Sequence, residues 1–234
     1  MKKNVFLLAS LLVVGLLVSS CQVTYKKDIK VSKGTIVNWD DVPEFDRVVV
    51  EAACDVKFVQ SDDLRKVETK SRDGDARLLE SVVEDGVLHV RCKEENLQRI
   101  KGKHMSVTIY SPDLIGLELR GAGQVDIDGL DTDTLKLEMR GSGDVKLKNI
   151  VCDRIDAQLK YAGQLKIDGL TAEQASLAIQ QVGNVNVGFV NSGVVECELQ
   201  GVGNAKLYGD VRHLEREAKG TGNVDVSELR IKEK

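Results

Sequence analysis

Three aspartates and two lysines are the residues of this chain whose types and spacing could do chemistry. Asp126, Asp128 and Asp144 lie on adjacent units of a repeated segment, beside Lys146 and Lys166. Carboxylates are preferred ligands of calcium, and a lysine next to bound calcium could take a proton from a sugar. Such an arrangement would suit a polysaccharide lyase. The favoured alternative is an exposed strand face whose mixed charges give solubility and protect the edges.

A glycine-containing phrase that returns about every twenty residues must position these side chains. Two examples are Gly121-Ala122-Gly123-Gln124-Val125 and Gly141-Ser142-Gly143-Asp144-Val145. The second glycine of the six phrases stands at Gly123, Gly143, Gly163, Gly183, Gly203 and Gly222. A period held this tightly predicts a solenoid, because each unit can bury its apolar face only against its neighbours.

Apolar residues alternate with polar ones on both sides of each second glycine. Leu137 and Met139 precede Gly143, and Val145 and Leu147 follow it. A period of two predicts strands with one buried face. Each unit is thus expected to hold two short strands and two turns, which is too short for a propeller blade or a helix pair. The sequence predicts an all-β chain, a parallel β-helix with coils of about 20 residues.

Two residue columns at the turns are predicted to be structural. The second glycines can adopt a tight corner at no steric cost. The position after each of them carries a polar side chain, and these residues are Gln124, Asp144, Gln164, Asn184, Asn204 and Asn223. Stacked polar side chains can bond to one another along the solenoid and to local backbone, so we interpret the column as a ladder. A binding role for the column is the alternative.

A basic column on the first strand is a second candidate binding surface. Arg120, Arg140 and Lys160 recur at the same position of successive units, next to a column that contains Glu118 and Glu138. Together with Asp126 and Asp128, the basic residues could form a face that contacts an acidic polymer. The favoured alternative is a self-neutralising solvated face, in which each exposed pair is worth under about 1 kcal/mol.

The first twenty residues are predicted to be a lipoprotein signal peptide. Lys2 and Lys3 precede a short apolar run, and small residues lead to Cys21. The run is too short to span a membrane. Cys21 is expected to be lipidated, residues 21–42 to form the tether, and the protein to lie at the outer membrane, facing the periplasm or the outside. An ordinary cleaved signal peptide is the alternative.

The folded domain is predicted over residues 43–231. Irregular coils are expected over 43–113, where they would cap the solenoid, and six regular coils over 114–229. Arg216 stands in a column that is apolar in earlier units, which indicates that the core ends there.

Composition and cysteines exclude several classes. A formal net charge of −4 gives no basic footprint for nucleic acid. No His/Cys cluster suggests a metal site, so no metal or cofactor is predicted, and calcium remains only as the ligand of the lyase alternative. Cys54 stands where a turn glycine is expected, and Cys54 with Cys92 is the one disulfide worth testing. Cys152 is expected in an exposed turn and Cys197 in a buried column.

These features together resemble a known family. A lipoprotein signal, a stretch that begins Phe45-Asp46-Arg47-Val48-Val49-Val50, and repeated Gly-x-Gly-Asn/Asp-Val units are similar to the putative auto-transporter adhesin, head GIN domain family of Bacteroidetes. The resemblance implies a right-handed, single-stranded β-helix of the pectate lyase type and an adhesin-like role. It offers no catalytic residues. Tyr161 and Gln181 depart from the first glycine of the phrase.

Three functions stay open from the sequence. The first is a non-catalytic envelope lipoprotein that binds glycan or protein, or serves a structural role. The second is a polysaccharide lyase or hydrolase that uses Asp126, Asp128 and Asp144. The third is a purely architectural envelope protein that self-assembles into homo-oligomers.

Overall fold

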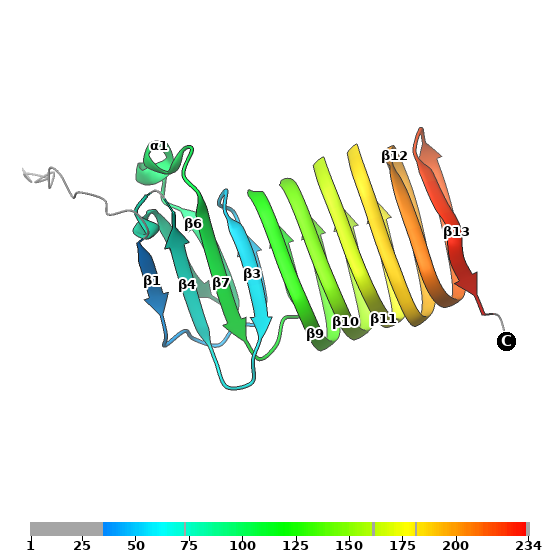
Figure 1. The fold of residues 1–234 in the computed structure, drawn as a ribbon, viewed down its shortest axis with the longest axis horizontal. Helices are drawn as coiled ribbons and strands as arrows, with labels where there is room; N and C mark the ends of the chain where they lie inside the picture. Colours follow the sequence, from blue (N-terminus) through cyan, green and yellow to red (C-terminus); the bar gives the residue numbers. More distant parts are fainter. Residues whose placement is uncertain (1–34, 73, 161, 181, 233–234) are drawn as a thin grey trace, which may run out of the picture. The chain divides into compact units, whose positions relative to one another are not determined.

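The computed structural model describes residues 35–232, with the exception of residues 73, 161 and 181. Val31–Lys234 forms one compact unit. The predicted signal peptide, the predicted lipidation site Cys21, most of the predicted tether, and the two departures at Tyr161 and Gln181 lie outside the described residues. Figure 1 shows the coils in chain order along the long axis, with an irregular cap at one end.

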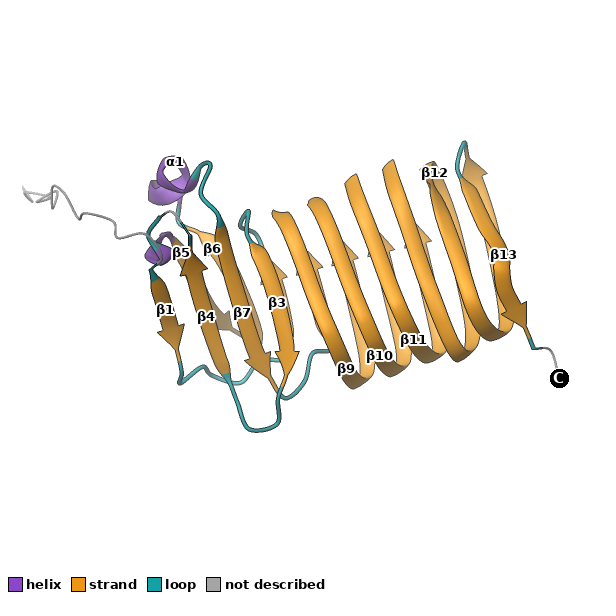
Figure 2. Ribbon diagram, viewed as in Figure 1, coloured by secondary structure: helices purple, strands orange, loops and turns teal. Residues whose placement is uncertain are grey.

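The cap combines short strands with the helices of the described chain. Its strands are β1 (Ile36–Trp39), β2 (Arg47–Val50), β3 (Asp55–Gln60), β4 (Lys66–Ser71), β5 (Leu79–Glu84), β6 (Val87–Cys92), β7 (Met105–Ser111) and β8 (Gly116–Leu119). Its helices are the 3-10 turns η1 (Ala76–Leu78) and η2 (Glu94–Asn96) and the single-turn α1 (Leu97–Ile100). Figure 2 shows these helices at the cap end. In the described part of the chain, no helix is long and apolar enough to cross a membrane.

The cap differs from the irregular coils expected over 43–113. Strands β1, β4 and β7 pair antiparallel, and so do β5 and β6. Parallel pairing begins where β3 joins β7 and β9, and where β2 joins β6 and β8. The cap therefore continues two faces of the solenoid and closes them with antiparallel strands.

The regular part is a parallel β-solenoid of about six turns, which confirms the predicted fold class. Its strands are β9 (Ala122–Met139), β10 (Ser142–Leu159), β11 (Ala162–Ile179), β12 (Val182–Gly220) and β13 (Asn223–Ile231). The 20-residue period is the strand register: Gly143 pairs with Gly123 on one side and with Gly163 on the other. Strand β12 is long because it continues around its corners (Figure 1).

The coils from β9 to the first half of β12 each bury three short stretches, one more than the sequence predicted. Val145 and Leu147 of β10 are buried, and Ile155 and Leu159 of the same strand are as well. Between these stretches, β10 also buries a third pair, Ile150 and Cys152. The same third pair recurs in the other coils as Leu130 and Thr132, Leu170 and Ala172, and Phe189 and Ser192.

The expectation that Cys152 lies in an exposed turn is therefore wrong, because Cys152 is only 6% exposed. Asn149 takes a left-handed φ of +52°, which turns the chain at that point and sends the next alternate side chains inward. Cys197 is buried as expected. Cys54 and Cys92 are free thiols, so the disulfide considered for them is not formed.

The second-glycine column is explained by how closely each coil follows the one before it. Gly143 has a φ of +137°, and a Cβ atom there would lie 2.0 Å from the carbonyl oxygen of Gly123. The same clash would recur at Gly163, 1.9 Å from the oxygen of Gly143. Cys54 is next to Gly123 at the head of this column, where a Cβ on Gly123 would meet the Cys54 oxygen at 2.2 Å. On its far side β3 pairs with β7 of the cap and not with a regular coil, so the clash between coils does not require a glycine at Cys54.

The core ends before the C-terminus. Arg216 is exposed, and its Nη1 donates to the backbone oxygen of Val224 at 3.0 Å. Charged neighbours on the same edge include Glu215, Glu217 and Lys219. Charges on a terminal strand discourage edge-to-edge pairing with another chain.

Candidate binding surface

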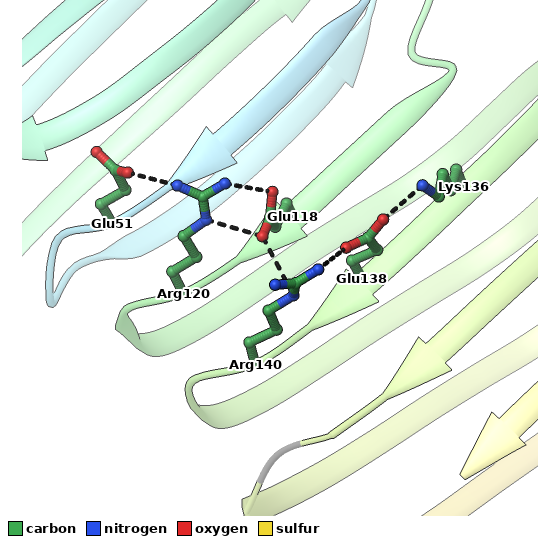
Figure 3. Close-up of polar contacts among 6 residues, drawn as sticks. All are labelled: Glu51, Glu118, Arg120, Lys136, Glu138 and Arg140. Atoms are coloured by element: carbon green, nitrogen blue, oxygen red, sulfur yellow. Dashed lines mark hydrogen bonds and ion pairs between the residues drawn. The ribbon is translucent and has the colours of Figure 1, made fainter. Parts of the chain in front are cut away.

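The outward side of β8, β9 and β10 carries the basic column predicted from the sequence, and we call it the charged face. Arg120 donates from Nε and Nη2 to Glu118 at 2.8 and 2.9 Å, and from Nη1 to Glu51 at 2.9 Å. Arg140 donates to Glu138 at 2.8 Å and lies 3.5 Å from Glu118. Figure 3 shows that carboxylates and cations alternate along one chain of contacts, which runs through Glu51, Arg120, Glu118, Arg140, Glu138 and Lys136.

Electrostatic compensation on the charged face is nearly complete in its first two coils. Lys136 forms an ion pair with Glu138 at 2.5 Å, and its hydrogen bond is the main reason that the pKa of Glu138 lies below its ordinary value. The guanidinium of Arg140 lowers the same pKa further. Carboxylates and cations therefore hold one another in fixed positions, and little free positive charge is left for an acidic polymer.

Lys160 differs from the two arginines of its column. Its backbone N–H donates to the Met139 oxygen at 2.8 Å, but its side chain is exposed and has no hydrogen bond or ion pair with the described residues. The reason lies in the glutamate column, which changes to Gln158 on the same strand. The structure thus brings Arg120 and Arg140 into one network and leaves Lys160 outside it.

A shallow groove lies where the cap meets the solenoid, beside the charged face. It has a volume of about 310 Å³, and its lining includes Arg47, Val49, His89, Gly116, Arg120 and Lys136. Val49 is only 8% exposed and forms an apolar floor beneath the charged rim. A groove this open could contact part of a polymer, but it does not enclose a small substrate.

The three aspartates of the lyase alternative are each engaged separately. Asp126 accepts from the Gln124 side chain at 2.6 Å, and Asp128 accepts from the Asn149 side chain at 3.3 Å. Asp144 accepts from the backbone N–H of Gln164 at 3.2 Å. Within the described ranges, no group of three or more His, Cys, Asp or Glu residues is arranged to hold a metal ion.

The two lysines of that alternative also differ. Lys166 forms an ion pair with Asp168 at 2.7 Å, on its own coil. Lys146 is exposed and forms no ion pair with any described residue. The strand register places Lys146 opposite Asp126 and Lys166, so charges of both signs follow one another along this face.

The polar column after the glycines is stacked in register. Asp144 pairs with Gln124 and with Gln164. Its bonds run from side chain to backbone, since Asp144 accepts from the Gln164 N–H and Asp55 accepts from the Gln124 N–H at 3.1 Å. Asp55 is thus a further member at the head of the column. Amide-to-amide bonds between coils are not among the hydrogen bonds of the described residues.

A tyrosine that the sequence analysis did not single out crosses the outward face of β11 and β12. The Tyr208 hydroxyl donates to Asp168 at 2.5 Å, and the Tyr208 ring covers Gly188. Burial raises the pKa of Tyr208 to about 12, and the bond to Asp168 adds to the effect. Hydrogen bonds from Lys166 and then from Tyr208 hold the pKa of Asp168 below its ordinary value.

A signal for this contact does exist in the sequence. Asp128, Lys148 and Asp168 occupy one outward column, and the next coil has Gly188 at that position. A missing side chain in a charged column leaves room for a long residue from the adjacent coil.

Comparisons with known proteins agree with this architecture. The model of the family described as "Putative auto-transporter adhesin, head GIN domain" matches residues 44–226. No curated protein matches the chain.

A putative adhesin from Bacteroides fragilis has 23% identity and a TM-score of 0.67, covering 83% of this chain and 97% of its own. A putative adhesin from Parabacteroides distasonis has 17% identity and a TM-score of 0.62 with the same coverage. A putative lipid binding protein from Parabacteroides distasonis has 17% identity, a TM-score of 0.50 and again 83% and 97% coverage. At these identities the structures support the fold alone. The family model covers most of the chain, and the chain therefore belongs to the auto-transporter adhesin, head GIN domain family.

Proposed function

We propose that this chain is a non-catalytic lipoprotein of the cell envelope whose solenoid is an adhesin-like binding module for glycan or protein. The observation that carries the proposal is the charged face, where Arg120, Arg140 and Glu118 are fixed by ion pairs within and between coils. Side chains that are already ordered lose less entropy when a ligand binds. Membership of an adhesin family supports the same role.

The open shape of the outer faces also favours binding over catalysis. Catalysis by a lyase needs a base and a metal, or several carboxylates, to converge on one substrate atom. Asp126, Asp128 and Asp144 instead have separate hydrogen-bond partners. An extended face suits a polymer or a protein surface, along which many weak contacts add up.

The proposal includes an anchor at Cys21. Lipid on this residue would hold the solenoid at the outer membrane, facing the periplasm or the outside. Metabolic labelling with radioactive palmitate tests this part: the wild-type protein should be labelled, and Cys21→Ser should not. Equal labelling of both proteins would contradict the anchor.

The binding role is tested with the full protein, purified from the membrane fraction in detergent. Its retention is measured on immobilised mannan and xylan, which are neutral, and on pectate and alginate, which are acidic, with and without calcium. We expect saturable retention that survives when Asp126, Asp128 and Asp144 are all changed to Asn. These three changes remove the carboxylates that a lyase would need and leave the charged face intact.

A matched variant addresses the charged face itself. Arg120→Gln with Arg140→Gln removes two cations and leaves the same carboxylates behind. Weaker retention of this variant, with retention of the triple Asn variant unchanged, would support the proposal. Absence of retention on all four polysaccharides, together with concentration-dependent oligomers and no captured envelope protein, would contradict it in favour of self-assembly.

A further inference from the structure

Tyr208 lies flat across the solenoid surface and spans two steps between coils. Its hydroxyl reaches Asp168, which is forty residues earlier in the chain, and Gly188 lies on the coil between them. Neighbouring coils are about 4.8 Å apart, so the ring must extend over the whole middle coil. A Cβ on Gly188 would lie 2.5 Å from Cε2 of the ring.

The contact between Gly188 and Tyr208 holds the ring in one orientation. Gly188 occupies an outward position, yet it is buried, and a Cβ added there would meet Cε2, Cζ and the hydroxyl oxygen of the Tyr208 ring first. Tyr208 itself is partly exposed. One face of the ring thus rests on the Gly188 backbone, and the hydroxyl is tied down at its far end. An aromatic side chain fixed in this way presents its other face to a ligand with little further loss of entropy.

Polar side chains surround the ring, and their charges are already paired. Lys166 forms an ion pair with Asp168 at 2.7 Å, and Lys206 forms one with Glu228 at 2.6 Å. Asn186 lies opposite Lys166 in the strand register and on the same face. The apolar ring is thus flanked by groups that can form hydrogen bonds and whose positive and negative charges are paired.

We propose that Tyr208, together with Asp168, Asn186 and Lys206, forms a binding site for one pyranose unit of a neutral glycan. The C–H face of a pyranose would stack on the exposed ring, and its hydroxyls would bond to the surrounding polar groups. This inference rests on the proposed function and names the ligand class and the place on the solenoid.

Two features favour a neutral glycan over other partners. An acidic sugar would need unpaired positive charge at the ring, and the two lysines that flank it, Lys166 and Lys206, are already paired with carboxylates. Lys148 lies opposite Asp168, one coil beyond the hydroxyl end of the ring. A protein partner commonly buries a contiguous apolar patch with charged residues at its rim. Here the residues that flank the ring are charged or amide side chains.

The test uses isothermal titration of the full protein in detergent with tetrasaccharides of mannose, glucose and N-acetylglucosamine. We expect at least one of them to bind, and Tyr208→Ala to weaken its affinity about tenfold, because the stacking contact is lost. Gly188→Ala should weaken it by a similar factor, since the added methyl group lifts the ring from the surface. Tyr208→Phe keeps the ring and loses the bond to Asp168, so its loss should be smaller.

Tyr110→Ala is the matched control. Tyr110 lies at an outward position of β7 in the cap, in the same sheet but separated from β12 by β3, β9, β10 and β11, and its removal should leave the affinity unchanged. Unfolding temperatures of all variants are measured in parallel. A tetrasaccharide that binds Tyr208→Ala as tightly as the wild type would overturn the site.

Failure of this site can be told apart from failure of the proposed function. Retention on pectate or alginate alone, with no tetrasaccharide bound, would overturn the Tyr208 site and leave the binding module in place. Loss of a captured envelope protein in Tyr208→Ala, without any effect on tetrasaccharides, would likewise overturn it and assign the ring to a protein contact.

Discussion

Gly143→Ala should destabilise the solenoid far more than Gly129→Ala, although both glycines have a left-handed φ. Gly143 has a φ of +137°, and its added Cβ would lie 2.0 Å from the oxygen of Gly123. Gly129 has a φ of +90°, and no atom lies within 4 Å of its added Cβ. The two variants share the backbone strain and differ in the clash.

The size of the difference follows from the bonds at the corner. Backbone strain alone costs about 1–3 kcal/mol at either position. Relief of the clash at Gly143 requires the corner to move away from the previous coil. This movement weakens two bonds between coils, from Ser142 N to Gly121 O at 3.0 Å and from Arg140 N to Leu119 O at 2.8 Å. Each bond contributes about 0.5–1.5 kcal/mol, so Gly143→Ala should cost roughly 4 kcal/mol and Gly129→Ala about 2.

Urea unfolding, followed by the circular dichroism of the strands at roughly 218 nm, measures the free energy of unfolding of both variants by linear extrapolation to zero urea. The effect of alanine on the unfolded chain is the same for both variants and cancels in their difference. Equal losses of stability in the two proteins would refute the reasoning, because the clash with the previous coil would then carry no cost.

Three further predictions concern the core, the thiols and the response to acid. Ile155→Ala, at a fully buried position, should cost roughly 2–5 kcal/mol in urea unfolding, whereas Val151→Ala, at a residue 45% exposed, should change stability by under about 0.5. Native protein at neutral pH should react with a thiol reagent first at Cys92. Burial raises the pKa of Cys54 to about 12 and the pKa of Cys152 and Cys197 to about 11, so fast labelling of these three thiols would contradict their burial. The pKa values of Glu138 and Asp168 are lowered in the folded state, so the folded state binds fewer protons than the unfolded state. Their stabilisation is complete above the unfolded pKa and is lost as the pH falls through the folded pKa, so the urea midpoint should decrease between about pH 6 and pH 3; a midpoint that stays constant would contradict the ion pairs.

The repeat predicted the solenoid because its period is the strand register. Gly143 and Asp144 lie opposite their counterparts twenty residues away, as a stacked coil requires. Burial of Val145 and Leu147 follows from simple alternation. These features depend on the local sequence and on adjacent coils that have the same residue pattern, and both are visible in the sequence.

Other features depended on backbone conformations and contacts that alternation does not encode. The left-handed Asn149 turns the chain and thereby buries Cys152, which looked like a turn residue. The antiparallel cap has no repeat from which its pairing could be derived. Contact between Tyr208 and Asp168 forms across a whole coil and depends on the absence of a side chain at Gly188.

The sequence predicted which residues form the charged face, and it predicted only part of the ion pairs between them. The columns of Arg120 and Arg140 and of Glu118 and Glu138 were visible in the sequence, together with their mutual neutralisation as the favoured alternative. The isolation of Lys160 could be derived in the same way, because the glutamate column changes to Gln158 in its coil. The contact of Arg140 with the glutamate of the preceding coil could not, since it depends on side-chain geometry.

The chain length of a bound polysaccharide tests the central claim most directly. The polymer that the protein retains best is incubated with a stoichiometric amount of protein, with and without calcium, and its size distribution is followed by chromatography. A binding module predicts a polymer of unchanged length under both conditions. Shortened chains, formed with calcium by the wild type and not by the triple Asn variant of Asp126, Asp128 and Asp144, would contradict the account and assign catalysis to that face.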